Sequence, residues 1–229
     1  MCASKRIYGP PFVPGQSVSR PAQRPWDISQ WDQALELIAT QSDDNRLLLG
    51  RGVPNLDYET LKPLSKILAG LHRSRDVNGF NYDKLSGSPE LRQQVVKLAV
   101  ASNCLLHPDD LLITTGCQEA LAIALRTLTK PGDVVAEDSP SFYGTMQILK
   151  ASGLKALEIP TDPQTGISLE ALDLALEQRP VRAIQVAPTF NNPLGYTMPE
   201  VRKRALFQLA QRFDVAIIED DIYGDLAFT

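Results

Sequence analysis

Three short segments of the sequence carry residue types that bind charged or polar small molecules. They are Gly116-Cys117-Gln118, Asn191-Asn192-Pro193 and Asp220-Asp221-Ile222-Tyr223. The first offers backbone amides to an anion, the second offers amide side chains that donate and accept hydrogen bonds, and the third offers carboxylates to a cation. Each segment follows an apolar run, so the chemistry of the chain is predicted to lie where short strands end.

The glycine turn at Gly116 is predicted to be an anion site. A helix is expected to begin at about Gln118, and the first N–H groups of a helix lie at the positive end of its dipole without acceptors inside it. The alternative is an ordinary glycine turn between a strand and a helix, since short glycine motifs are weakly specific. Cys117 has no identifiable base partner that would make it a nucleophile, so its backbone is the predicted functional part.

The other two segments also have a simpler interpretation. Asn-Pro followed by glycine is common in turns, and two carboxylates after an apolar strand are common in solvated turns. Asp220 and Asp221 are also compatible with a metal site, but neither His72 nor His107 lies near a ligand-like motif. No metal site is therefore predicted.

The elements expected to position these segments alternate between short apolar strands and helices. Strands are predicted over residues 111–114, 134–137, 157–159, 183–187 and 215–219. Helices are predicted over residues 118–128, 142–151, 169–178 and 199–213, and a capping box from Thr197 to Glu200 opens the last. This alternation predicts an α/β fold of three layers, α/β/α, with a mostly parallel sheet. Ligands of such sheets bind at the carboxyl ends of the strands.

The region before residue 81 differs in composition from the rest. Prolines at positions 10, 11, 14, 21 and 25 favour an extended arm or linker over residues 1–25. Residues 26–80 are predicted to form a helical segment, with one helix beginning near residue 27 and another spanning about 57–71. The main domain is predicted over 81–229, and Ser88-Pro89 is a start signal for a helix within it.

The bulk composition excludes several classes of protein. Lysine and arginine total 23 against 27 for aspartate and glutamate, so the chain itself lacks the basic surface typical of nucleic-acid binding. The scattered cysteines, Cys2, Cys104 and Cys117, fit neither a zinc site nor a disulfide framework and favour a reducing, cytoplasmic setting. No apolar run is long enough to cross a bilayer, so no membrane contact is predicted.

In chain order, the motifs resemble those of the fold type I pyridoxal-phosphate (PLP) enzymes of the class I and II aminotransferase family. The resemblance spans roughly residue 52 to the C-terminus. Its motifs are Leu49-Gly50-Arg51-Gly52-Val53-Pro54, Tyr82-Asp83-Lys84-Leu85-Ser86-Gly87, Leu91-Arg92, Gly116-Cys117-Gln118, Pro140-Ser141-Phe142, Asn192-Pro193-Leu194-Gly195 and Asp220-Asp221-Ile222-Tyr223. It implies the large domain of a PLP-dependent transferase, with pyridoxal 5′-phosphate as the cofactor.

The resemblance assigns the phosphate and the ring face of that cofactor to two of the motifs. The backbone amides of Gly116, Cys117 and Gln118 would hold the phosphate. Phe142 would stack on the pyridine ring, with the adjacent Tyr143 as an alternative.

The resemblance also assigns the polar groups of the ring. Asn192, helped by Tyr223, would bind the ring hydroxyl. Asp220 would pair with the protonated ring nitrogen, which keeps the ring able to accept electrons, while Asp221 would be a structural neighbour. Tyr82 would reach the phosphate in a neighbouring subunit, which implies a homodimer with shared sites.

The family pattern further implies residues that would follow Thr229. The lysine that forms a Schiff base with the cofactor would lie some tens of residues beyond Asp220, so no catalytic residue is assigned within these 229 residues. The arginine that grips the substrate carboxylate would also lie further on. These residues alone are therefore expected to be inactive in transamination, and their sheet is expected to be incomplete with one unpaired strand edge.

Two main classes of function fit the resemblance. In the first, the intact protein is an aminotransferase that moves an amino group between an amino acid and a 2-oxo acid. In the second, the chain is the effector domain of a MocR/GntR-type PLP-dependent transcription regulator. The second is favoured by the proline-rich start and by Glu219-Asp220-Asp221-Ile222-Tyr223, which resembles that group and the related 2-aminoadipate-type aminotransferases. A decarboxylase or lyase on the same scaffold would share every motif.

Overall fold

The computed structural model describes residues 58–73, 82, 84–101 and 103–227. The predicted arm over residues 1–25 and the helix expected near residue 27 lie outside the described residues. The described residues form two compact units, one within 33–115 and the other within 116–229. In these described parts of the chain, no helix is both long and apolar enough to cross a membrane.

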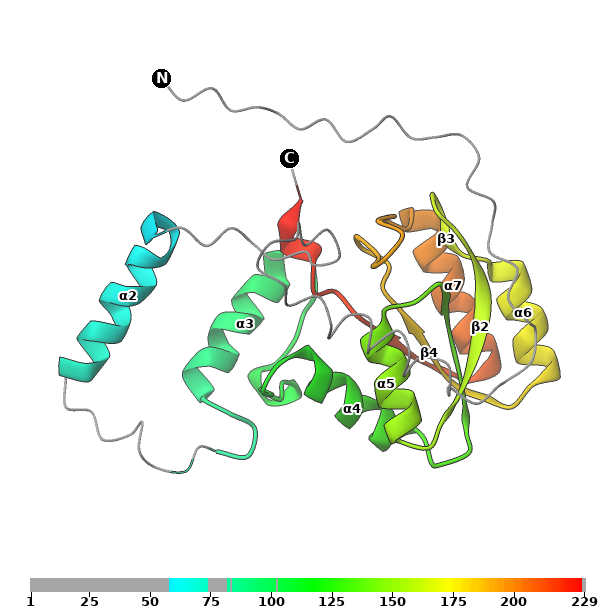
Figure 1. The fold of residues 1–229 in the computed structure, drawn as a ribbon, viewed down its shortest axis with the longest axis horizontal. Coiled ribbons are helices and arrows are strands. Elements are labelled where there is room, and N and C mark those ends of the chain that lie inside the picture. Colours follow the sequence, from blue (N-terminus) through cyan, green and yellow to red (C-terminus); the bar gives the residue numbers. More distant parts are fainter. Residues whose placement is uncertain (1–57, 74–81, 83, 102, 228–229) are drawn as a thin grey trace, which may run out of the picture. The chain divides into compact units, whose positions relative to one another are not determined.

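A five-stranded sheet forms the centre of the unit within 116–229 (Figure 1). Its strands are β1 (Val134–Ser139), β2 (Lys155–Asp162), β3 (Gly166–Ile167), β4 (Val181–Val186) and β5 (Ala216–Glu219). Their order is β3-β2-β1-β4-β5; β2, β1, β4 and β5 run parallel, and β3 alone is antiparallel to its neighbour β2. The predicted mostly parallel sheet is confirmed, with β3 as an addition that the sequence did not indicate.

Helices pack on both faces of this sheet. They are α4 (Cys117–Leu128), α5 (Tyr143–Ala151), α6 (Leu169–Gln178) and α7 (Glu200–Phe213), with a short 3-10 helix, η3 (Gly224–Leu226), after β5. Side chains alternate along β1: Val135 joins the apolar cluster of α4 and α5, whereas Val134 and Ala136 join that of α6 and α7. The predicted three layers are therefore present, and the predicted helix over 169–178 matches α6 at both ends.

β5 is an edge strand among the described residues. It pairs with β4 alone, and its residues are partly exposed, in contrast to the fully buried β1. This agrees with the expected unpaired edge, because the parallel strands buried on both faces lie in the middle of the sheet.

The strand predicted over residues 111–114 is wrong. These residues are extended, but none of them joins a strand in the described sheet. The amide of Ile113 instead donates to the carbonyl of Ser86 at 3.1 Å, and the Ile113 side chain lies against Gly87, which has a φ of +83°. A short apolar run fits any buried extended segment, so its pattern alone does not identify a ladder partner.

The capping box predicted from Thr197 to Glu200 is also wrong. α7 begins at Glu200 after Pro199, and no side chain caps this end of the helix. The Thr197 hydroxyl instead accepts a hydrogen bond from the amide of Phe190 at 3.4 Å. Glu200 forms an ion pair with Arg204 at 3.0 Å. Both side chains of the predicted capping box therefore have other partners.

The unit within 33–115 contains α2 (Tyr58–Arg73), α3 (Pro89–Ala101) and the 3-10 helix η2 (Pro108–Asp110). The Ser88 hydroxyl accepts from the amide of Leu91 at 3.3 Å, as the start signal predicts for α3. The apolar face of α2 is exposed in this unit, since Leu64, Ile67 and Leu68 are each more than half accessible.

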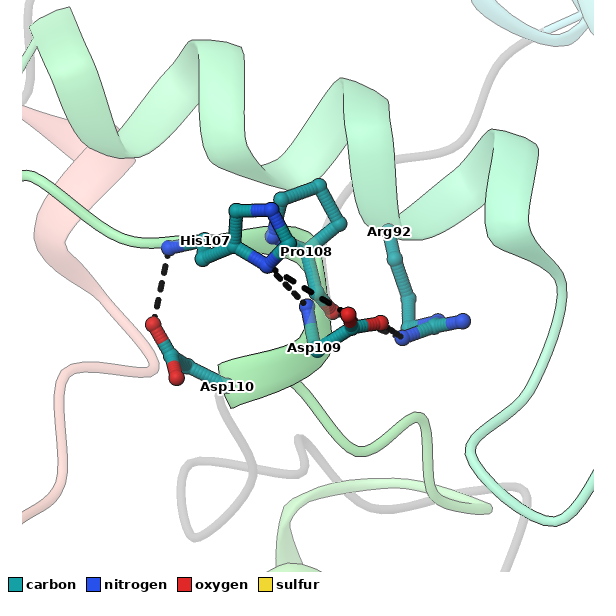
Figure 2. A network of polar contacts seen from close by, with 5 residues as sticks. All are labelled: Arg92, His107, Pro108, Asp109 and Asp110. Carbon is teal, nitrogen blue, oxygen red and sulfur yellow. Dashed lines mark hydrogen bonds and ion pairs between the residues drawn. The ribbon is translucent and has the colours of Figure 1, made fainter.

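A polar network fastens η2 to α3 (Figure 2). Arg92 is 8% exposed, and its Nη1 donates to the carbonyl of Pro108 at 2.7 Å and to Asp109 Oδ1 at 3.1 Å. His107 Nδ1 accepts from the amide of Asp109, and Asp110 Oδ2 accepts from the amide of His107. These reciprocal bonds form a capping box at the N-terminus of the short helix, and the Arg92 bonds hold the helix against α3.

Replacing Arg92 with alanine should destabilise this unit by roughly 2 kcal/mol, because the partly buried Pro108 carbonyl then loses its charged donor. The exposed ion pair with Asp109 contributes little to that figure. Urea unfolding measures the loss, and Lys97→Ala on the exposed face of the same helix is the control, with an expected change below about 0.5 kcal/mol. Equal effects from the two variants would contradict a specific role for the Arg92 network.

Candidate functional site

The predicted site residues of the unit within 116–229 follow three neighbouring parallel strands. Phe142 comes shortly after β1, Asn192 lies in the loop after β4, and Asp220 directly follows β5. Because β1, β4 and β5 run parallel and side by side, their carboxyl ends lie at the same edge of the sheet. The topology therefore brings these three segments to one edge.

The N-terminus of α4 has no side-chain cap. Gly116 is its N-cap residue, with φ +111° and ψ 171°. A side chain other than hydrogen would strain this φ, and no atom lies within 4 Å of the place where a Cβ would stand. The helix end is thus accessible and carries the positive end of the α4 dipole.

Cys117 and Asp220 join this helix end to the end of β5. The Cys117 thiol donates to Asp220 Oδ1 at 3.6 Å, although the two residues are 103 positions apart. Burial, together with the charge of Asp220, raises the pKa of the thiol, so Cys117 is a donor here and not a thiolate. The amide of Ile222 donates to the same oxygen, Asp220 Oδ1, at 3.3 Å, so two donors hold this carboxylate.

Asn192 and Tyr223 form the second polar contact of the site. Asn192 Nδ2 donates to the Tyr223 hydroxyl at 3.5 Å, and both side chains are half-buried. Tyr223 lies three residues beyond Asp220, so this contact joins the loop after β4 to the segment after β5. Two of the predicted site residues, from different loops, are therefore in direct contact.

Phe142 and Gln118 meet above Gly144, the second residue of α5. A Cβ placed on Gly144 would lie 2.4 Å from Phe142 Cε1 and 2.5 Å from Gln118 Nε2. The Phe142 and Tyr143 rings are 4.4 Å apart between centroids and inclined by 50°. Glycine at this position therefore permits the aromatic ring after β1 to approach the first turn of α4.

A buried carboxylate beneath these loops was not predicted from the sequence. Asp138, at 2% exposure, accepts from the Tyr196 hydroxyl at 3.0 Å, from Asn191 Nδ2 at 3.1 Å and from the Ala187 amide at 3.4 Å. Burial raises its pKa to about 6, against the opposing effect of these donors. Burial and the Asp138 charge raise the pKa of Tyr196, which therefore remains a donor.

Glu137, the neighbour of Asp138 in β1, points to the opposite face of the sheet. Its carboxyl is completely buried, and the Ser141 hydroxyl beside it only partly offsets the effect of burial. Burial raises its pKa well above the usual range, which favours the neutral acid. Two adjacent acids in a buried apolar strand were a signal in the sequence, because charges are rarely placed there without a partner.

Tyr82, the remaining predicted site residue, belongs to the other unit. Its side chain is fully exposed there. Its predicted role concerns a neighbouring subunit and stays a prediction.

The predicted site residues of the unit within 116–229 therefore comprise a helix N-terminus without a side-chain cap, a hydrogen-bonded carboxylate, an amide in contact with a phenol, and an aromatic ring. A sequence profile described as aminotransferase class I and II matches residues 44–229. The chain belongs to the class I and II aminotransferase family. This match confirms the resemblance inferred from the motifs.

Individual members and related proteins of this family span both functional classes considered above. An uncharacterized HTH-type transcriptional regulator of Escherichia coli (strain K12), YjiR, is 46% identical over 98% of this chain and 47% of its own length. The crystal structure of Pyrococcus horikoshii kynurenine aminotransferase in complex with PMP is similar with a TM-score of 0.71 and 27% identity, over 82% of this chain and 48% of that one.

A third relative bears on the cofactor of the family. The alpha-aminoadipate aminotransferase LysN from Thermus thermophilus, solved in complex with N-(5′-phosphopyridoxyl)-L-leucine, is similar with a TM-score of 0.66 and 27% identity. The match covers 83% of this chain and 50% of that one. The chain thus spans about half the length of each of these three proteins.

Proposed function

We propose that this chain is the part of an aminotransferase-like protein that binds pyridoxal 5′-phosphate. The observation that carries the proposal is the contact between Cys117 and Asp220, which joins the first turn of a helix without a side-chain cap to a hydrogen-bonded carboxylate. A phosphate needs the former, and a protonated ring nitrogen needs the latter. An ordinary glycine turn does not require a nearby carboxylate, and a solvated acidic pair does not require a nearby helix N-terminus.

The residues present fit the two charged ends of that cofactor. The backbone amides of Gly116, Cys117 and Gln118 would hold the phosphate, since no side chain caps this end of α4. Asp220 would accept a hydrogen bond from the ring nitrogen and keep it protonated. When bound, the cofactor supplies a cationic ring that accepts electrons from a substrate carbon.

The remaining site residues fit the ring itself. Asn192 and Tyr223, already in contact, would bind the ring hydroxyl. Phe142 would cover one face of the ring and exclude water from it, with Tyr143 packed beside it. These residues orient the ring, whereas Asp220 holds a proton at its nitrogen.

For the intact protein we propose amino-group transfer between an amino acid and a 2-oxo acid. The similarity to the two aminotransferases named above supports this reaction class. This chain matches about half of the length of each of them. We further propose a homodimer in which Tyr82 reaches the phosphate of the neighbouring subunit. Cross-linking of the intact protein, with and without the Tyr82→Phe substitution, would test the shared site.

A PLP-dependent transcription regulator is the second candidate function. It is favoured by the 46% identity to the HTH-type regulator YjiR, which extends over 98% of this chain. The complete coding sequence distinguishes the candidates, since a regulator requires a DNA-binding domain joined to this one. If such a domain is present, DNA binding by the intact protein should respond to the cofactor.

Binding of pyridoxamine 5′-phosphate to the chain tests the cofactor proposal directly. This compound lacks the aldehyde of pyridoxal phosphate, so it does not react with surface lysines. Isothermal titration should give saturable 1:1 binding with a Kd on the order of 100 µM, whereas pyridoxamine without the phosphate should bind at least about tenfold more weakly. Absence of saturable binding, or equal affinity for both compounds, would contradict the proposal.

Replacing Gly144 with alanine should weaken that binding about fivefold to tenfold, because the new methyl group displaces Phe142 and Gln118. The clash should also destabilise the unit by roughly 1–2 kcal/mol, despite the better helix propensity of alanine. Gly70→Ala in α2, where no atom lies within 4 Å of the new Cβ, is the matched control and should leave affinity unchanged. Unchanged affinity in Gly144→Ala would show that Phe142 and Gln118 do not bind the ligand.

A further inference from the structure

The loop that carries Asn192 is closed by its own hydrogen bonds. The amide of Asn191 donates to the carbonyl of Tyr196 at 3.0 Å, and the amide of Gly195 donates to the carbonyl of Asn191 at 2.6 Å. The amide of Leu194 donates to Asn191 Oδ1 at 3.2 Å. Asn192 therefore lies within a turn whose two ends, Asn191 and Tyr196, are held together.

Both ends of this turn are attached to one side chain of the sheet. Asn191 and Tyr196 are each 3% exposed, and each donates to a different carboxylate oxygen of Asp138. The Ala187 amide, at the end of β4, donates to the same oxygen as Asn191. The turn is thus anchored to β1 through a single buried carboxylate that accepts three hydrogen bonds.

Asp138 also lies just before the segment that carries Phe142. It is the penultimate residue of β1, and the next amide, of Ser139, donates to the Thr161 hydroxyl on β2 at 2.9 Å. Asp138 therefore lies four residues before Phe142 and also contacts the turn that contains Asn192.

We infer that Asp138 is a positioning residue of the cofactor site: through Asn191 and Tyr196 it fixes the turn that presents Asn192. This inference rests on the proposed function for the contact between Asn192 and the ring. It adds a residue that touches no ligand itself. An apolar residue at position 138 would fill the space but would remove the acceptor of the Tyr196 hydroxyl and of the Ala187 amide, and would leave Asn191 Nδ2 only its 3.5 Å bond to the Tyr196 hydroxyl.

The Tyr196→Phe substitution tests this role with little change of shape, and Ile184→Val is the control. Ile184 is fully buried in the apolar cluster that also contains Tyr196, and it has no polar group, so its truncation destabilises the fold but removes none of the hydrogen bonds of the turn. In Tyr196→Phe, amide hydrogen exchange of Leu194 and Gly195 should accelerate about tenfold relative to Ile184→Val at matched global stability. Affinity for pyridoxamine 5′-phosphate should fall about fivefold to tenfold in Tyr196→Phe alone.

The two readouts separate this inference from the proposed function. Unchanged exchange at Leu194 and Gly195 in Tyr196→Phe would overturn the inference, whatever the affinity. Faster exchange with unchanged affinity, in a chain that binds the ligand, would also overturn it, because the anchored turn would then not position Asn192. If the unsubstituted chain binds no ligand, the proposed function fails, while the exchange rates still decide whether Asp138 holds the turn.

Discussion

Replacing Asp220 with alanine should weaken the binding of pyridoxamine 5′-phosphate roughly 30-fold to 150-fold, a loss of about 2–3 kcal/mol. The physical reason is that the ring nitrogen carries a proton only while a carboxylate accepts it. Asp220 is already fixed for this purpose by the Cys117 thiol and the amide of Ile222. The expected loss of binding free energy lies at the lower end of the range for buried charge pairs, because Asp220 retains some exposure.

Asp221→Ala is a matched control for this substitution. Asp221 is the same residue type one position along, is exposed, and its carbonyl accepts from the amide of Gly224. Its replacement should change affinity less than about twofold, since surface substitutions have small effects. An analogue with carbon in place of the ring nitrogen sharpens the test. The unsubstituted chain should prefer the nitrogen compound, and the Asp220→Ala variant should not.

Equal losses from Asp220→Ala and Asp221→Ala would contradict the assignment of the ring nitrogen to Asp220. So would an unchanged preference for the nitrogen compound in Asp220→Ala. Either result would leave the anion site at Gly116 as the sole part of the proposal still supported.

The stability of the fold should fall as pH rises, through the titration of Asp138. Its pKa is about 6 in the folded chain against an ordinary value of 3.8. The folded state therefore binds more protons than the unfolded state between these values. The stabilising effect is complete below about pH 4 and is lost as pH rises through about 6. In full it is worth roughly 3 kcal/mol, of which about 2 kcal/mol falls between pH 4.5 and 7.5.

Comparison with Asp138→Asn isolates this effect. The asparagine variant loses the charge and the second acceptor oxygen, which lowers its stability by an amount independent of pH. The exposed carboxyls titrate in both chains and cancel in the difference, whereas Glu137, whose pKa the Asp138 charge helps to raise, loses that contribution in the variant. Urea unfolding at several pH values should show the advantage of the unsubstituted chain shrinking by about 2 kcal/mol between pH 4.5 and 7.5. A constant difference would mean that Asp138 titrates alike in the folded and unfolded chains.

Several elements were predictable because their signals are local. α6 matches its prediction because Ser168 caps it, accepting from the amide of Ala171, and its leucines repeat at helical spacing. The buried strands β1 and β4 followed from short apolar runs between helices. The placement of Asn192 and Asp220 at strand ends then required only the rule that parallel strands share one carboxyl edge.

The failures have a common cause, since each concerned a choice between partners. Thr197 was expected to cap α7 but instead bonds to Phe190. Residues 111–114 were expected to join the sheet, yet Ile113 bonds to Ser86. A capping side chain and an extended segment are satisfied equally well by other partners, which lie seven residues away for Thr197 and 27 for Ile113, and the sequence pattern does not rank these partners.

The sequence alone determined the type of fold, the family and the segments that carry chemistry, because apolar periodicity and short motifs are properties of neighbouring residues. Only the tertiary structure decided that Cys117 contacts Asp220, and that one buried carboxylate, Asp138, holds the turn of Asn192 through Asn191 and Tyr196. Such contacts join residues roughly 50 to 100 positions apart. They depend on which buried donors and acceptors find one another when the chain is packed, and no local pattern encodes that choice.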